Sequence, residues 1–163
     1  MVEIRPRLAI AALALALGGC TWSNGVHTAT ADRSCIADAA ERVAKVDWAT
    51  AKPIAVRIRQ GEFKPVLVSL RKDTAYVLRL TNDDDRNRVF GAPEFFAAVA
   101  VGKVAVGDEV SSARCISAIT VPPNATAEVQ IVAVRDGRYD FEETPLVLGP
   151  VLTGYGAGVV IVR

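Results

Sequence analysis

The spacing of apolar residues predicts a domain built mainly of β-strands. After Pro53 the apolar residues Ile54, Val56 and Ile58 alternate with smaller or charged ones. This period of two is typical of strands that bury one face. Further strand-like segments lie at 66–70, 76–80, 89–90, 117–121, 126–134, 138–142 and 158–162, with turn residues between them. Short strands at this spacing predict an all-β fold, a Greek-key β-sandwich.

Two short helical segments interrupt this pattern. In residues 34–46, apolar side chains recur at intervals of three or four, which predicts a short N-terminal helix that Asp32 or Ser34 would cap. Pro93 precedes an apolar run, and proline is favoured at the first position of a helix. A helical turn is therefore expected near 93–98.

Two polar or aromatic segments have competing interpretations. The run 82–87 is rich in Asp and Asn and is expected to be an exposed loop. Asp83–Asp85 with Glu94 would offer oxygen ligands to a hard cation, although acidic loops are usually only solvated. The pair Phe95–Phe96 is expected in the core, and an exposed pair would instead mark a contact surface.

The first twenty residues have the features of an export signal. Arg5 and Arg7 precede an apolar run, Leu8–Leu17, which is too short to span a bilayer as a helix. The sequence Leu-Gly-Gly-Cys that ends at Cys20 resembles the lipobox of bacterial lipoproteins. That resemblance implies a signal peptide over 1–19 and a lipid on Cys20 that holds the chain to a membrane. The alternative is an ordinary signal peptide with an incidental cysteine.

The rest of the chain divides into a tether and a domain. Residues 20–33 are rich in Ser, Thr, Asn and Ala, which predicts a flexible tether. Residues 34–163 are enough for one domain with its own core. We therefore expect a lipoprotein of the cell envelope that faces the periplasm. By analogy with lipoprotein sorting, Thr21 favours the outer membrane if the cell is Gram-negative.

Cysteine use agrees with export. Of three cysteines, Cys20 is assigned to the lipid, which leaves Cys35 and Cys115 as a pair in an oxidising compartment. A disulfide between them would close a loop of 80 residues and contribute about 3 to 4 kcal/mol. The alternatives are two unrelated thiols, or a Cu(I) site completed by His27.

Charge excludes one class of partner. The net charge is +1, and without Arg5, Arg7 and Glu3 of the leader 17 basic residues face 17 acidic ones. A balanced surface provides no electrostatic attraction for nucleic acid. The expected partners are the membrane, through the lipid on Cys20, and an unidentified envelope protein.

Several motifs occur in a recognisable order along the chain. They are Phe-x-Pro within Gly61–Pro65, Tyr-x-Leu-x-Leu-x-Asn at Tyr76–Asn82, the segment Val89–Phe96, and then Val121–Asn124 and Gly137–Phe141. Together they resemble the small exported cupredoxins, a plastocyanin-like family of copper proteins. The resemblance covers roughly 47–162 and implies a cupredoxin-like Greek-key β-sandwich.

The same resemblance locates the positions of the copper ligands. A histidine stands two residues before the Phe of the Phe-x-Ala-Pro-Glu-Phe-Phe segment in the family, and here that position is Arg88. The thiolate follows the Tyr of the last long strand by four residues, which gives Glu143. The second histidine falls at Leu146, and the axial methionine at Tyr155 or Gly156.

A type 1 copper centre requires two imidazoles and a thiolate, usually with a weak axial thioether. The chain has one histidine, His27, and one methionine, Met1. We therefore expect a degenerate copper site and no cofactor. The alternative is copper held by a non-classical ligand set or one shared with a partner.

Opposite charges at Arg88 and Glu143 predict an ion pair at one end of the sandwich, where copper would otherwise sit. The alternative is two unrelated surface charges. Enzyme activity is not expected, because the domain lacks a histidine for a catalytic triad, and Glu142 and Glu143 should face opposite sides of a strand. The favoured function is a non-enzymatic binding or scaffold domain. Copper handling is the alternative, and electron transfer has the least support.

Overall fold

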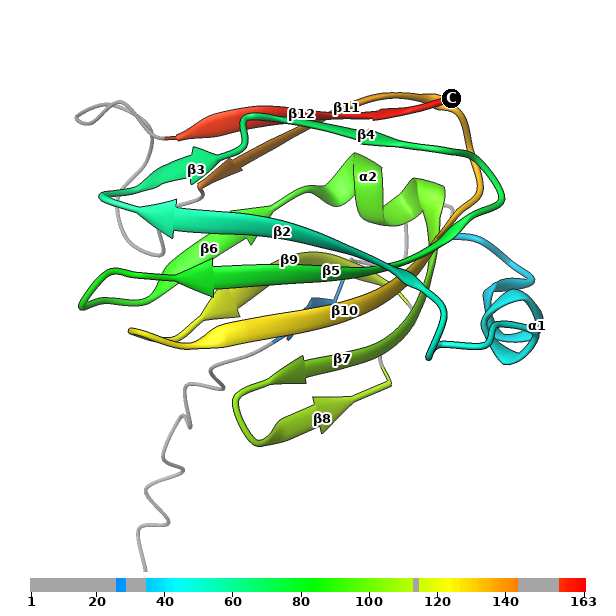
Figure 1. The fold of residues 1–163 in the computed structure, drawn as a ribbon, viewed down its shortest axis with the longest axis horizontal. Coiled ribbons are helices and arrows are strands. Elements are labelled where there is room, and N and C mark those ends of the chain that lie inside the picture. The colour runs from blue at the N-terminus through cyan, green and yellow to red at the C-terminus, as the bar shows by residue number, and fades with distance from the viewer. Residues whose placement is uncertain (1–25, 29–34, 113–114, 144–155) are drawn as a thin grey trace, which may run out of the picture.

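A computed structural model describes residues 26–28, 35–112, 115–143 and 156–163, the first range by its backbone only. Within these residues, two sheets of six strands pack face to face (Figure 1). The first has the order β1-β9-β6-β11-β12-β4, with β1 at Val26–Thr28, β4 at Leu67–Leu70, β6 at Arg88–Gly91, β9 at Ile116–Val121, β11 at Gly137–Glu143 and β12 at Ala157–Val162. The second has the order β3-β2-β5-β10-β7-β8, with β2 at Lys52–Arg59, β3 at Glu62–Lys64, β5 at Ala75–Asn82, β7 at Val99–Val106, β8 at Glu109–Ser111 and β10 at Thr126–Ala133.

Both sheets are mixed. Most neighbouring strands are antiparallel, but β2 runs parallel to β5 and β12 runs parallel to β4. These parallel pairs connect strands that are distant in sequence, so long crossovers are required. The predicted all-β sandwich is confirmed.

The core lies between the sheets and follows from the alternation in sequence. In β2, Val56 and Ile58 are buried while Arg57 and Arg59 are exposed. A group of phenylalanine rings fills the middle of the sandwich, where Phe63 packs edge-on against Phe141 with ring centroids 5.1 Å apart. Edge-to-face packing of this kind is favourable beyond the area that it buries.

The two helices are short, as expected. The first, α1, spans Ala39–Ala44, only part of the predicted 34–46, and it begins after Asp38. It covers the outer side of β7 through a second apolar cluster, formed by Ile36, Ala39, Ala100 and Val132 with Val43, Val46 and Trp48 packed against it. The predicted caps, Asp32 and Ser34, lie outside the described residues.

The helix α2 spans Pro93–Ala98 and confirms the predicted helical turn. Its residues Phe95 and Phe96 are buried, as expected. No helix among the described residues is long and apolar enough to cross a bilayer.

Four strands were not predicted, and one of them, β3, is a three-residue strand at the edge of its sheet. Five of the first six residues of β7 are buried, so β7 shows little alternation, because α1 packs on the side that would otherwise meet water. The strand β8 is a three-residue edge strand. The strand β1 pairs with β9 inside the expected tether, so that expectation is wrong at Val26–Thr28. Backbone pairing needs no apolar side chain, so composition did not reveal it.

A disulfide joins Cys35 to Cys115, with the two Cα atoms 5.9 Å apart. It links the segment before α1 to the start of β9, as predicted from the cysteine count. Because both sulfur atoms are bonded to each other, they are not available as thiolates for the Cu(I) site considered with His27.

Candidate functional site

The residues at the predicted copper-ligand positions Arg88 and Glu143 lie at one end of the sandwich. Arg88 begins β6 and Glu143 ends β11. Glu143 is paired across the sheet with Phe90, two residues after Arg88. Residues two apart on a strand share a face, so Arg88 and Glu143 are diagonal neighbours on the same side of the sheet.

These two residues form the predicted ion pair. Arg88 Nη1 donates to Glu143 Oε1 at 2.7 Å. The side chains are 13% and 8% exposed, respectively. The alternative of two unrelated surface charges is therefore wrong. Their assignment as former copper ligands remains a prediction.

A third residue completes the cluster, which we call the Arg88 cluster: Asp84, Arg88 and Glu143. Arg88 Nε donates to Asp84 Oδ2 at 2.7 Å, and the Asp84 side chain is 10% exposed. Two carboxylates thus accept from one guanidinium through different nitrogen atoms. Hydrogen bonds between ionised groups are shorter and stronger than neutral ones.

The turn between β2 and β3 holds Asp84 from the other side. The backbone amide of Gln60 donates to Asp84 Oδ1 at 2.7 Å, and that of Gly61 donates to Asp84 Oδ2 at 3.1 Å. Burial raises the pKa of the Asp84 carboxyl, but these two amides and Arg88 outweigh burial and bring it below its ordinary value. Asp84 is therefore an anion at neutral pH.

Arg88 keeps its positive charge for a related reason. Burial by itself would lower the pKa of the guanidinium, but hydrogen bonds and charge from Glu143 and Asp84 raise it above its ordinary value. The Arg88 cluster therefore holds one cation between two acidic side chains, in a place with little access to water. A buried charge of this kind destabilises the fold if its partners are removed.

Asn82 fixes the base of the loop that carries Asp84. It is fully buried, and its Nδ2 lies 2.8 to 2.9 Å from the carbonyl oxygens of Arg86, Val121 and Pro122. Its Oδ1 accepts from the Asp84 amide at 3.0 Å. The expectation of an exposed loop over 82–87 is therefore wrong at Asn82 and Asp84. Local hydrogen bonds satisfy these polar groups, so they can be buried.

Gly61 is required next to the cluster. Its φ is +77°, and a Cβ atom there would lie 2.8 Å from Glu143 Oε2 and 3.2 Å from Arg88 Nη1. A residue with a side chain would be strained in this left-handed backbone conformation. Its Cβ atom would also collide with the ion pair. The turn can therefore approach the Arg88 cluster only because residue 61 has no side chain.

The structure does not support the hard-cation alternative. Asp83 accepts from Arg57, and Asp84 accepts from Arg88, so arginines already neutralise both carboxylates. Glu94 lies in α2. Among the described residues, no three histidine, cysteine or acidic side chains gather in a metal-binding group.

The donors at this end do not fit a type 1 copper centre. The described residues here supply a guanidinium and two carboxylates, whereas that centre requires imidazoles and a thiolate. His27 on β1 is paired with Ala118 on β9, and Ala118 is paired with Gly91 on β6. Gly91 follows Arg88 by three residues. Two further predicted ligand positions, Leu146 and Tyr155, lie outside the described residues.

Comparison with solved structures identifies the fold. A multi-copper oxidase from Pseudomonas thermotolerans matches 72% of this chain with 16% identity and a TM-score of 0.51, over 31% of its own length. Auracyanin A, a blue copper protein from Chloroflexus aurantiacus, matches 69% of this chain over 99% of its own, with 13% identity and a TM-score of 0.46. A mutant of amicyanin matches 74% over 89%, with 14% identity and a TM-score of 0.40.

At these identities the likeness is one of fold, and the fold is cupredoxin-like. The chain spans less than half the length of the multicopper oxidases that it matches. No protein-family model matches the sequence, and no curated protein matches it.

Asp84 and Gly61 were not predicted as parts of the site. A signal for Asp84 was present, since it precedes Arg88 by four residues in a short loop. No local pattern marks Gly61, because its role depends on the approach of β11 from a distant part of the chain.

Proposed function

We propose that this chain is a lipid-anchored, periplasmic binding or scaffold protein, with a cupredoxin-like domain that lacks a type 1 copper site. The observation that carries the proposal is the Arg88 cluster. It lies where the cupredoxin resemblance places a histidine and the thiolate ligand. In this proposal, charged hydrogen bonds replace the bonds to a metal as the link between β6, β11 and the loop after β5.

Ligand chemistry supports the absence of a type 1 site. A protonated guanidinium has no lone pair for a metal, and Arg88 is held in that state by two carboxylates. The chain contains one histidine, and two of its three cysteines are joined to each other. A trigonal site with two imidazoles and a thiolate needs more than these residues supply.

Export and anchoring are supported by the N-terminal sequence. The charged start, the short apolar run and the Leu-Gly-Gly-Cys sequence agree with a lipoprotein signal. A disulfide between Cys35 and Cys115 suits an oxidising compartment such as the periplasm. The lipid on Cys20 would hold the domain near the membrane surface, where it would meet its partners.

Copper titration tests the first part of the proposal. Full-length protein in detergent is titrated with cupric ion, and with cuprous ion under ascorbate, which leaves the disulfide closed, then desalted and analysed for metal and absorption. We expect no stoichiometric copper and no intense blue band. A blue band would overturn the proposal, and stoichiometric copper without that band would favour the alternative of copper handling by another ligand set.

Intact mass and membrane fractionation test the anchor. The parent chain should carry the added mass of a lipid on Cys20 and sediment with membranes. The Cys20→Ser variant should lack this mass, whereas Thr21→Ala, a matched control beside it, should keep the lipid. A parent chain without lipid would contradict the anchoring.

A further inference from the structure

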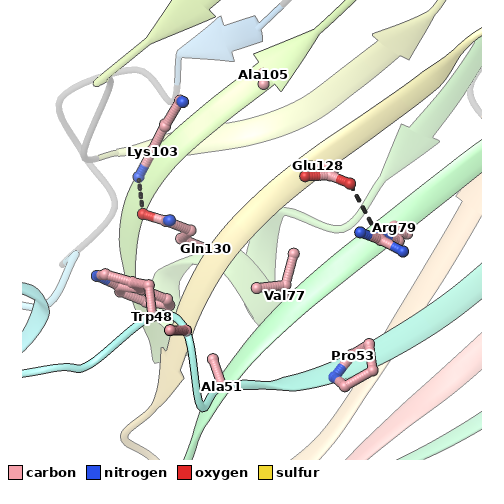
Figure 2. A pocket seen from close by; sticks show the side chains of 10 residues that line it. Trp48, Ala51, Pro53, Val77, Arg79, Lys103, Ala105, Glu128 and Gln130 are labelled. Atoms are coloured by element: carbon pink, nitrogen blue, oxygen red, sulfur yellow. Dashed lines mark hydrogen bonds and ion pairs between the residues drawn. The ribbon is translucent and has the colours of Figure 1, made fainter.

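A hollow of about 420 Å3 lies on the outer face of the sheet that contains β2, β5, β10 and β7 (Figure 2). It is formed near the start of β2, whereas the Arg88 cluster lies beyond the end of β2. The hollow therefore belongs to a different part of the domain from the predicted copper position.

The floor of the hollow departs from the usual pattern of a solvent-facing sheet. Outward positions of such a sheet are normally polar, because every second residue meets water. Here Pro53 is paired with Val77 across neighbouring strands, and Ala105 lies opposite Glu128. Small apolar side chains at Pro53, Val77 and Ala105 leave a depression with an apolar patch at its floor.

Trp48 forms one wall of the hollow. Its side chain is half-buried and packs against the second apolar cluster beneath α1. Figure 2 shows Trp48, Ala51 and Pro53 along one side, and Lys103 and Ala105 on the opposite side. An indole held by core packing offers a rigid aromatic surface, which loses little conformational entropy when a ligand binds.

The polar groups around the floor include both donors and acceptors. Arg79 Nε donates to Glu128 Oε1 at 2.8 Å, so these charges largely neutralise each other. The Lys103 amide donates to Gln130 Oε1 at 3.3 Å, which orients the Gln130 side chain beside Val77. This arrangement suits a ligand with many neutral hydroxyl groups better than a strongly charged one.

We propose that this hollow binds a saccharide. A sugar ring has an apolar face of C–H groups that stacks on an aromatic side chain, and its hydroxyls both donate and accept hydrogen bonds. The volume falls within the range of roughly 300 to 1,000 Å3 that is usual for small-molecule sites. The inference adds a ligand class to the proposed binding function, but it depends on neither the lipid nor the absence of copper.

The second tryptophan of the chain, Trp22, allows a direct assay. In a Trp22→Phe background, Trp48 is the only tryptophan, so its fluorescence reports the hollow. Full-length protein in a detergent without a sugar headgroup is titrated with chitotetraose, cellotetraose and maltotetraose, and binding is checked by calorimetry. We expect at least one of these oligosaccharides to shift Trp48 emission saturably below about 10 mM, as a weak site would.

Two variants locate the binding without touching the core. Gln130→Ala removes a polar partner and should weaken binding about tenfold. Ala105→Leu fills the floor and should abolish binding. Arg59→Ala, on the same face of β2 but outside the hollow, should bind like the parent. The proposal is overturned if none of the three oligosaccharides binds, or if both hollow variants bind as well as the parent.

Discussion

Replacing Arg88 by methionine tests the energetics of the Arg88 cluster. The variant keeps most of the side-chain volume but removes the cation from between Asp84 and Glu143, whose side chains are only 10% and 8% exposed. Removing one partner of a buried ion pair costs about 3 to 5 kcal/mol, because the remaining charge is left without compensation. We expect a loss of this size in the free energy of unfolding at pH 7.

The loop offers a matched control for this variant. Arg57 pairs with Asp83, next in sequence to Asp84, but the Arg57 side chain is 66% exposed. An exposed pair contributes at most about 1 kcal/mol, so Arg57→Met should change stability little. Urea unfolding followed by Trp48 fluorescence in a Trp22→Phe background would measure both variants. If Arg88→Met costs no more than Arg57→Met, burial does not strengthen the ion pairs of Arg88.

The cost of Arg88→Met should also depend on pH. The pKa of Asp84 is lowered in the folded state, so its contribution to stability is present above its unfolded value of about 3.9 and is lost as the pH falls through the folded value. Arg88 is one cause of that lowering. The difference between parent and variant should therefore be larger at pH 7 than at pH 3. An equal difference at both pH values would show that the charge of Asp84 does not matter.

Three further changes test the supports of the fold and of the site by the same unfolding assay. Gly61→Ala should lose more stability than Gly107→Ala: both glycines have positive φ, which costs about 1 to 2 kcal/mol, but a Cβ atom at Gly107 meets nothing within 4 Å. Equal losses would contradict the close approach to the ion pair. Replacing Cys35 and Cys115 together by serine should cost about 3 to 4 kcal/mol, and reductant should then have no further effect. Asn82→Leu should cost at least about 3 kcal/mol, because buried carbonyls lose their donor; a loss below 1 kcal/mol would show that water replaces it.

Periodicity predicted the strands that are exposed on one side. Apolar and polar residues alternate in β2 and β5 because each strand has one face in the core and one toward solvent. The strand β7 lacked this signal, since α1 covers its outer face and makes it apolar on both sides. Such burial depends on tertiary packing, which local sequence does not encode.

The ion pair of the site was predictable from the family resemblance, whereas the third residue of the cluster was not. Arg88 and Glu143 were identified by counting from motifs that resemble a family, and opposite charges then suggested a pair. Asp84 was interpreted as solvated because acidic runs usually are. Its burial follows from Asn82 and from the amides of Gln60 and Gly61, which are brought to it by the folding of β2 against β5.

Whether the Arg88 cluster stands in place of copper can be seen in a crystal structure of the protein soaked with cupric ion, with anomalous data collected at the copper edge. We expect Arg88 Nη1 to stay hydrogen-bonded to Glu143 Oε1, near 2.7 Å, and no anomalous peak to lie between β6 and β11. A copper peak at this position, with Glu143 as a ligand and Arg88 displaced, would show that this end of the sandwich binds the metal after all.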